Sequence, residues 1–210
     1  ETSKARKAQM PGAVALERDE DTLYAAGVDG RLWRGELERA ALEAVGEPFE
    51  GELVALALVS GDKLAVAHGP GVSIVSRADG TVHQHLALPE RATCLAADPS
   101  GEWLVVGTDR GVVQVYQCED QDDFELSAQS KLHEGEVRAL LFETEELRVL
   151  SSGSDQRLLV THVRGELDPE DRGGSGMHDK PIEDMIQGLV DRFYTLGGDS
   201  SVKAWPAGRN

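Results

Sequence analysis

A phrase of two short apolar runs recurs about every forty residues along this chain of 210 residues. In each copy the two runs flank a Gly/Asp turn, and the second run ends in an aromatic residue or its stand-in. The copies are LYAAGVDGRLW (23–33), LAVAHGPGVSIV (64–75), LVVGTDRGVVQVY (104–116), VLSSGSDQRLLVTH (149–162) and FYTLGGDSSVKAW (193–205). The last residues of successive copies are 42, 41, 46 and 43 positions apart. A period of this size is typical of propellers and solenoids, so it constrains the fold more than any single residue does.

A second apolar run precedes each phrase, at residues 13–16, 53–59, 93–97, 137–142 and 182–190. These runs contain four to nine residues and are bounded by turn-forming segments such as DPSG (98–101). Runs of that length predict strands, because a helix needs about ten or more uninterrupted residues. Only ELERAALEAV (36–45) is long enough for a helix, and two interpretations of it stay open: an outer strand or an inserted helix.

Two segments, KLHEGEVRALLF (131–142) and GMHDKPIEDMI (176–186), place a His before a short polar turn and an apolar strand. The last phrase ends in GGDSSVKAWP (197–206). These segments resemble the opening and the ending of a WD repeat. In that family the opening His, a Ser or Thr, the turn Asp and the terminal Trp form a hydrogen-bonded set that ties the strands of a blade together. The resemblance places this set at His178, Thr195, Asp199 and Trp205.

The other units keep parts of the same set, and the resemblance implies a blade-tying role for those parts too. A buried Trp needs an acceptor for its one N–H, and a buried His–Asp pair satisfies polar groups that would otherwise be costly. The second unit keeps almost none of the set. The residues concerned are His133, Ser152 and Asp155 in the fourth unit, with Thr161 or His162 in the place of Trp; Asp109 and Tyr116 in the third; and Asp29 and Trp33 in the first.

Five units in register predict an all-β fold, a WD40-like β-propeller of about five four-stranded blades in a single domain over residues 1–210. The repeat units span approximately residues 11–37, 51–76, 91–117, 133–164 and 178–206. Two possibilities stay open for the ends of the array. Either SKARKAQM (3–10) supplies the outer strand of the last blade and closes a five-bladed ring, or the chain is part of a larger ring. An unclosed ring exposes two blade edges, which proteins seldom tolerate.

The acidic composition and the few cysteines limit the functional class. The net charge of −17 and the pI near 4.7 argue against nucleic acid, because binding to phosphates needs a coherent basic surface. No apolar stretch approaches the ~18 residues that span a membrane, so no membrane partner is expected. Two cysteines, Cys94 and Cys118, make no disulfide framework, which favours a reducing, cytoplasmic setting.

Catalytic and metal motifs are weak throughout, so we expect no enzyme activity, no cofactor and no metal. GGDSS (197–201) superficially resembles the GDSGG of trypsin-like proteases, but a blade turn explains the same residues. His83 and His85 stand at i, i+2 on an expected outer strand, where a third ligand would be needed for a metal. DPEDRGGSG (168–176) lacks the residue order of a calcium loop. For His133 and His178 a structural role is favoured over titration or metal binding.

Charge placement suggests where a partner could bind. The acidic clusters ERDED (17–21), EDQDD (119–123), ETEE (143–146) and ELDPED (166–171) are expected on one face of the blades. Two interpretations stay open: ordinary solvated loops, or a polarised disc that steers partners by charge. On the second interpretation, candidate partner-binding residues on the opposite face are Arg31, Arg91, Arg110, Arg157 and Lys180.

The function predicted from these observations is a non-catalytic scaffold or recognition module. Its partner would be a protein or peptide, and an acidic or phosphorylated segment of that partner is expected to lie across one face of the propeller. The alternative is a regulatory or sensor domain of a larger multidomain enzyme. The length of the native open reading frame discriminates between the two.

Overall fold

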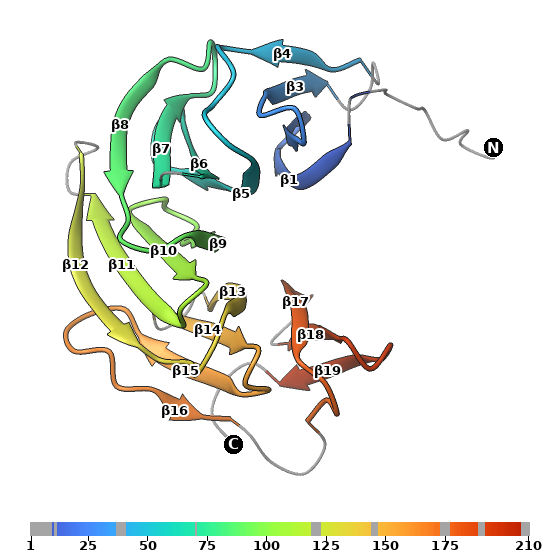
Figure 1. The fold of residues 1–210 in the computed structure, drawn as a ribbon, viewed down its shortest axis with the longest axis vertical. Helices are drawn as coiled ribbons and strands as arrows, with labels where there is room; N and C mark the ends of the chain where they lie inside the picture. Colours follow the sequence, from blue (N-terminus) through green and yellow to red (C-terminus); the bar gives the residue numbers. More distant parts are fainter. Residues whose placement is uncertain are drawn as a thin grey trace. The chain divides into compact units, whose positions relative to one another are not determined.

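A computed structural model describes residues 10, 12–36, 41–69, 71–118, 123–143, 147–172, 177–188 and 192–206. Every regular element within these residues is a β-strand, and none of them is helical. The strands form five antiparallel sheets in which the order in space follows the order in the chain (Figure 1). Each sheet is one blade of a β-propeller, which confirms the predicted all-β propeller class. The blades fall into two compact units, which are larger than the repeat units above. From here on the first unit is Glu1–Pro89, with the first two blades, and the second unit is Glu90–Asn210, with the other three.

The first unit contains two four-stranded blades. Of the ambiguous segment at 36–45, residues 43–45 form an outer strand, and residues 37–40 lie outside the described part of the chain. The strands are β1 (Ala13–Asp19), β2 (Thr22–Gly27), β3 (Leu32–Glu36) and β4 (Glu43–Val45) in blade 1, and β5 (Leu53–Val59), β6 (Lys63–His68), β7 (Gly71–Ser76) and β8 (Val82–Ala87) in blade 2.

The second unit contains blades 3 to 5. Blade 5 has three strands among the described residues. Of residues 3–10, which the sequence offers as its fourth strand, residues 3–9 lie outside the described part of the chain and Met10 lies in no strand. The strands are β9 (Ala92–Ala97), β10 (Trp103–Thr108), β11 (Val112–Cys118) and β12 (Phe124–Lys131) in blade 3; β13 (Val137–Glu143), β14 (Arg148–Gly153), β15 (Leu158–His162) and β16 (Glu170–Asp171) in blade 4; and β17 (Ile182–Gln187), β18 (Arg192–Gly197) and β19 (Val202–Pro206) in blade 5.

Burial along the strands reflects their place in a blade. Every residue of β10 and β14 is buried, because a central strand has a paired strand on each side and packed side chains on both faces. In the outer strand β12 every residue after the first is exposed or half-buried. Short apolar runs in the sequence therefore become central strands, and polar runs become outer ones.

Neighbouring blades within a unit pack face to face. We call the side of a blade that meets the preceding blade its front face and the other side its back face. Three apolar clusters fill the contacts, one in the first unit and two in the second. They join the back of blade 1 (Tyr24, Ala26, Leu32) to the front of blade 2 (Leu53, Leu56, Leu64), the back of blade 3 (Cys94, Val105, Val113) to the front of blade 4 (Val137, Leu140, Val149), and the back of blade 4 (Leu150, Leu158, Val160) to the front of blade 5 (Ile182, Met185, Phe193).

Candidate functional site

In blade 5 the structure brings together all four residues of the predicted hydrogen-bonded set. The His178 ring lies 3.0 Å from the Asp199 carboxylate through Nδ1 and 2.7 Å from the Thr195 hydroxyl through Nε2. Trp205 donates its indole N–H to the same hydroxyl over 2.8 Å and stacks on Phe193. His178 and Thr195 are buried, and Trp205 is half-buried. The set thus joins the segment before β17 to β18, to β19 and to the turn between them.

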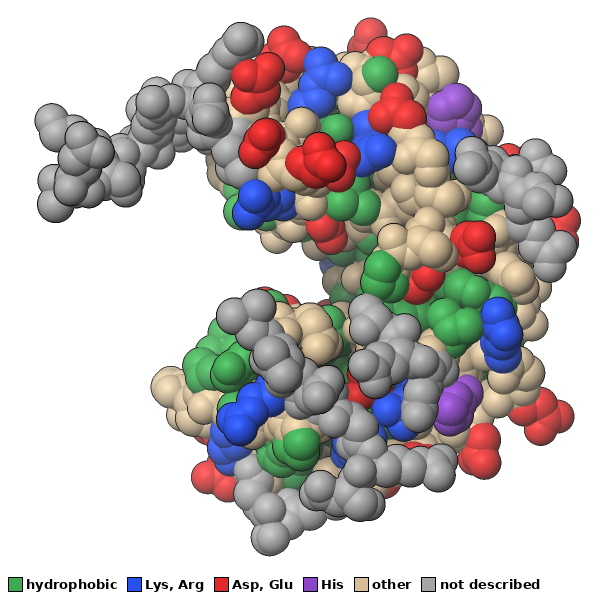
Figure 2. All heavy atoms as spheres, turned by 180° about the vertical axis from the view of Figure 1, so that it is seen from behind, with side chains coloured by type: hydrophobic (Ala, Val, Ile, Leu, Met, Phe, Trp, Pro, Cys, Tyr) green, Lys and Arg blue, Asp and Glu red, His purple; other side chains and the backbone are tan. Residues whose placement is uncertain are grey.

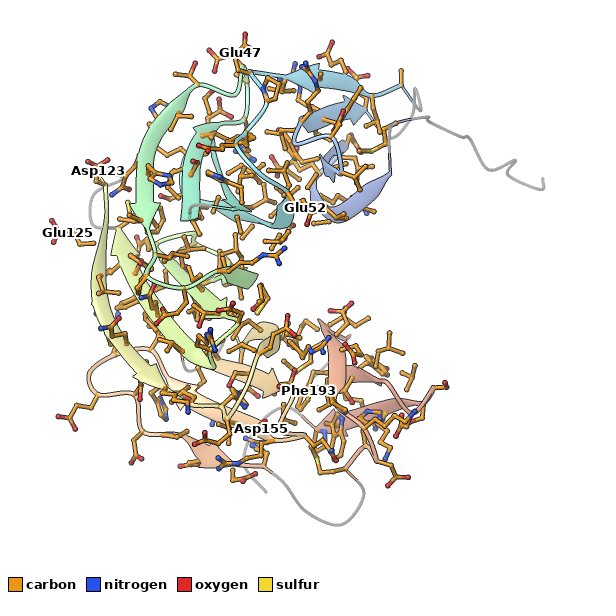
Figure 3. The ribbon with its side chains drawn as sticks, in the orientation of Figure 1. Glu47, Glu52, Asp123, Glu125, Asp155 and Phe193 are labelled. Atoms are coloured by element: carbon orange, nitrogen blue, oxygen red, sulfur yellow. The ribbon has the colours of Figure 1, made fainter. Side chains whose placement is uncertain are left out.

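Blade 4 contains a similar set, with one change of residue. His133 lies 3.0 Å from Asp155 through Nδ1 and 2.9 Å from the Ser151 hydroxyl through Nε2 (Asp155 in Figure 3). Ser152, the residue that the resemblance indicated, donates instead to the carbonyl of Ile182 in the next blade, over 3.2 Å. Adjacent residues of a strand point to opposite faces, so only one of the two serines can reach the His133 ring.

The Trp position of blade 4 is held by Thr161. Thr161 pairs with Val149 across the hairpin, as Trp205 pairs with Phe193 in blade 5. The Thr161 hydroxyl is buried and has no hydrogen-bond partner among the described residues. Blade 4 therefore has three members of the set where blade 5 has four.

The ionisation of these groups fits the hydrogen bonds. Burial lowers the pKa of His133, although the Asp155 carboxylate beside it acts in the opposite direction. Burial also opposes ionisation of Asp155, but hydrogen bonds from the Glu134 amide, the His133 ring and the Arg157 amide hold its pKa below its ordinary value. A neutral His133 then donates its Nδ1–H in a hydrogen bond to the ionised Asp155 and accepts a hydrogen bond from the Ser151 hydroxyl at Nε2. Both ring nitrogens are occupied.

A glycine at the end of the second strand makes room for each imidazole, a signal that the sequence interpretation missed. A Cβ atom on Gly197 would lie 2.2 Å from Nδ1 of His178, and one on Gly153 would lie 2.5 Å from Nδ1 of His133. In blade 1 a Cβ on Gly27 would lie 2.2 Å from a carboxylate oxygen of Asp29. The Gly two residues before each turn Asp is therefore part of the set, because no side chain fits there.

Blade 2 replaces the set with a different arrangement. His68 pairs with Leu53, the register position of the glycines at 153 and 197 in the other blades. Its buried ring lies 2.8 Å from the Ser73 hydroxyl through Nε2 and 3.3 Å from the Glu50 carbonyl through Nδ1. The Ser73 hydroxyl also lies 3.3 Å from Nδ1 of His85. Blade 2 thus obtains its imidazole from the second strand, and burial lowers the pKa of this His68 ring.

Blade 1 joins its turn Asp and its Trp directly. Trp33 donates its indole N–H to Asp29 over 3.4 Å. The cross-strand register of Trp33 matches that of Lys203 in blade 5, two positions before Trp205. This difference explains why Asp and Trp are four residues apart in blade 1 and six apart in blade 5.

Blade 3 keeps the aromatic residue of the set but has no Asp at the turn position. Tyr116 has the register of Trp205 and donates its hydroxyl proton to Gln114 over 2.9 Å. The Asp109 amide donates to the carbonyl of Arg91, as the amide of Ser154 does to that of Glu136 in blade 4. Asp109 therefore corresponds to the residue before a turn Asp. Its side chain is exposed, and Arg110 occupies the position of Asp155.

The candidate cations of the second unit lie at one end of its blades. Thr93 donates to the Val137 carbonyl over 2.6 Å, and Arg138 forms an ion pair of 3.0 Å with Glu183. These contacts join matching positions at the starts of β9, β13 and β17, so the three strands begin at the same end. We call it the opening end; it also carries the turns between the second and third strands. Arg91, Arg110, Arg157 and Lys180 all lie there, whereas Arg31 occupies the corresponding turn of blade 1 in the first unit.

These cations differ in how far their charge is already balanced. Arg157 forms an ion pair of 3.0 Å with Asp171, which reaches this end because it lies on β16. Arg91, Arg110 and Lys180 are exposed. Arg110 and Lys180 form no ion pair with another described residue. Those two side chains are therefore the ones whose charge is available to a ligand.

The opening end is mixed in charge rather than basic. Asp109 and Asp179 are exposed there beside Arg110 and Lys180, and Figure 2 shows blue and red side chains interspersed on the one face that it draws. At the other end of blade 3, Asp123 and Glu125 are exposed and point into solvent (Figure 3). Most of the clusters at 119–123 and 143–146 lie outside the described residues, as residues 119–122 and 144–146.

Neither a metal-binding group of side chains nor a membrane-spanning helix is found among the described residues. No group of three or more His, Cys, Asp or Glu side chains in it is arranged to hold a metal ion. His83 and His85 lie on the outer strand β8 and are exposed. No described helix has the length and apolarity needed to cross a membrane.

Comparison with known proteins shows the fold alone. No protein-family model matches the chain, and no curated protein sequence matches it. Among solved structures, the chain is similar to the computationally designed Ika8 protein, with a TM-score of 0.67 and 16% identity over 92% of this chain and 70% of that one. It is also similar to the computationally designed Ika4 protein, with a TM-score of 0.63 and 19% identity over 79% of this chain and 99% of that one. At such identities the likeness carries no information about a ligand.

Proposed function

We propose that this protein is a non-catalytic interaction module whose opening end, in the second unit, binds an extended acidic or phosphorylated segment of a partner protein. The observation that carries the proposal is the combination of fixed turns and exposed cations at that end. Two buried His-centred sets hold the turns of blades 4 and 5, and exposed Arg110 and Lys180 stand at the openings and turns beside them. A site that is already rigid loses little entropy when a ligand binds.

The two histidines support the non-catalytic part of the proposal. His133 and His178 are the buried imidazoles of this end, and each uses both ring nitrogens in hydrogen bonds within its own blade. General acid–base catalysis needs a ring nitrogen within reach of the substrate. Within this proposal, the two rings hold the turns of the opening end in place through their hydrogen bonds to Asp155 and Asp199.

Charge supports the choice of an acidic ligand. An exposed Arg offers a planar, bidentate donor to carboxylate or phosphate, and an exposed Lys adds a point charge. The net charge of −17 opposes the approach of an acidic segment from most directions, so the local cations must supply both attraction and orientation. Binding is accordingly expected to weaken as salt rises.

An array of 12-residue peptides tests the proposal, with each sequence present in serine, phosphoserine and glutamate versions. The double variant Arg110→Glu/Lys180→Glu should lose binding to the phosphoserine and glutamate versions. The matched control is Arg164→Glu, which reverses a charge at the other end of blade 4, where Arg164 lies 5.9 Å from the Trp103 ring centre. Equal loss in the control, or preference for neutral peptides, would contradict the proposal.

A further inference from the structure

Blade 1 has a hollow of about 380 Å³ on its back face, at the end that carries the turn between β1 and β2. Its lining residues come from β2, β3 and the start of β4. Thr22 pairs with Glu36 across the second hairpin of the blade. Two residues further along β2, Tyr24 pairs with Arg34, so its side chain projects from the same face as that of Thr22. The hollow is therefore built by one blade of the first unit, and its volume is within the range of small-ligand sites.

A buried hydroxyl without a partner lines this hollow. Tyr24 is 5% exposed, yet its hydroxyl forms no hydrogen bond with another described residue. Buried tyrosine hydroxyls usually find a partner. Burial raises the pKa of Tyr24, so the hydroxyl stays neutral and offers both an acceptor and a donor. Tyr24 is thus a polar group whose hydrogen-bond partner a ligand can supply.

Arg34, which also lines the hollow, is already bound through both terminal nitrogens of its guanidinium group. Nη2 donates to the Glu43 carboxylate over 2.8 Å. Nη1 donates to the carbonyls of Ala78 and Arg77, in the turn after β7 of blade 2, over 2.7 and 3.2 Å. These contacts fix the guanidinium group and balance its charge within the first unit. Arg34 therefore forms a wall of the hollow rather than a receptor for an anion.

The charge that remains at the hollow is negative. Glu36 and Glu43 both line it and are both exposed, so two carboxylates stand against the single positive charge of Arg34. The acidic cluster at 17–21 runs through the adjacent turn. This field repels an anion and attracts a cation.

We propose that this hollow binds a primary ammonium group on an alkyl chain, such as a lysine side chain of a partner protein or a free alkyl diamine. The ammonium group lies between the Glu36 carboxylate and the Tyr24 hydroxyl, and the alkyl chain packs against the half-buried Leu42 and the Tyr24 ring. An ammonium group has three donors and no acceptor, so it suits a lining of carboxylates and a neutral hydroxyl.

This site is independent of the one proposed at the opening end. It belongs to the other unit, and its ligand has the opposite charge. The double variant Arg110→Glu/Lys180→Glu should therefore bind an amine as the wild type does. Tyr24→Phe should in turn bind acidic peptides as the wild type does. Either proposal can fail while the other holds.

NMR titration of the full chain, isotopically labelled at Cζ of tyrosine, tests where an amine binds. The chain has three tyrosines, and the signal that is lost in Tyr24→Phe reports on the hollow. The probes are the peptide acetyl-Gly-Gly-Lys-Gly-Gly-amide and diaminopentane, each beside a neutral form whose amines are acetylated. Both amines should shift the Tyr24 signal until it saturates, and the acetylated forms should leave it in place.

Ligand-observed NMR then compares the affinities of variants. Tyr24→Phe keeps the ring and removes the hydroxyl, and Glu36→Gln keeps the shape and removes the charge. Each should weaken amine binding about fivefold, which corresponds to one net hydrogen bond. The matched controls are Tyr194→Phe in blade 5 and Glu125→Gln on β12, which make the same chemical changes in the second unit and should bind like the wild type.

The two probes also distinguish the source of the amine. Tighter binding of the lysine peptide supports the proposal with a partner protein as the source, and tighter binding of diaminopentane supports it with a free amine. Equal binding of the acetylated forms, an unshifted Tyr24 signal, or an equal loss in the control variants would overturn it. If Tyr24→Phe does not fold by circular dichroism, the exposed pair Glu36→Gln and Glu125→Gln is judged by the same outcomes.

Discussion

The hydroxyl of Thr195 is the central acceptor and donor of blade 5, and replacing it by Val tests the role of the whole set. Thr195 is fully buried, and its hydroxyl bonds to Trp205 over 2.8 Å and to His178 over 2.7 Å. Val has nearly the same shape and suits a strand, so packing and strand propensity change little. The substitution leaves a buried imidazole nitrogen and a half-buried indole N–H without a partner.

The expected cost is about 2–4 kcal/mol, since a net hydrogen bond contributes about 1 kcal/mol and a buried unsatisfied group costs about 1–3 kcal/mol more. The indole N–H lies on a half-buried ring and regains part of its loss from water, which sets the upper limit. Ser151→Ala in blade 4 should cost less, because Ser151 serves His133 and has no Trp to satisfy.

Urea unfolding followed by far-UV circular dichroism measures both variants. A double-mutant cycle of Thr195→Val with Trp205→Phe then isolates the bond between those two side chains, because Phe keeps the ring contact and removes the N–H. If Thr195→Val unfolds within about 0.5 kcal/mol of the wild type, the set does not hold blade 5 together, since such a change is typical of an ordinary surface substitution.

Two further predictions concern the space and the protonation of the same sets. Gly197→Ala should destabilise the protein by about 1–3 kcal/mol in urea unfolding, because its Cβ would lie 2.2 Å from Nδ1 of His178. Ala at the adjacent Gly198 should cost less, because its Cβ would meet nothing closer than a carboxylate oxygen of Glu183 at 3.3 Å. The free energy of unfolding should fall as the pH drops from about 7.5 through 6.5. Burial holds the pKa of His133 and of His68 below the ordinary 6.5. In this pH range the unfolded chain therefore binds protons that the folded chain does not bind. His133→Gln should flatten the pH dependence, and an unchanged slope in the double variant with His68→Gln would contradict the assignment.

The sequence by itself determined the number of blades, the class of the fold and the position of one complete set. These properties are local, because strand lengths, turn residues and a period of about forty residues are all written in consecutive positions. His178, Asp199 and Trp205 were predictable for the same reason. Each stands at a fixed distance from a turn, and the turn fixes the geometry of the hairpin.

Only the tertiary structure decided which face of each strand a residue occupies. A register shift interrupts the first hairpin in every blade, between Val137 and Ala139 in blade 4 and between Ile182 and Asp184 in blade 5. A shift of one residue moves a side chain to the other face, so the choice between Ser151 and Ser152 could not be made from the pattern.

The same limit applies to contacts between distant segments. The replacement of an opening His by His68 and the pairing of Arg157 with Asp171 both depend on which strand lies opposite. Periodicity specifies each blade as a hairpin array, but packing between strands and between neighbouring blades of a unit decides which polar groups are satisfied and which apolar side chains are buried.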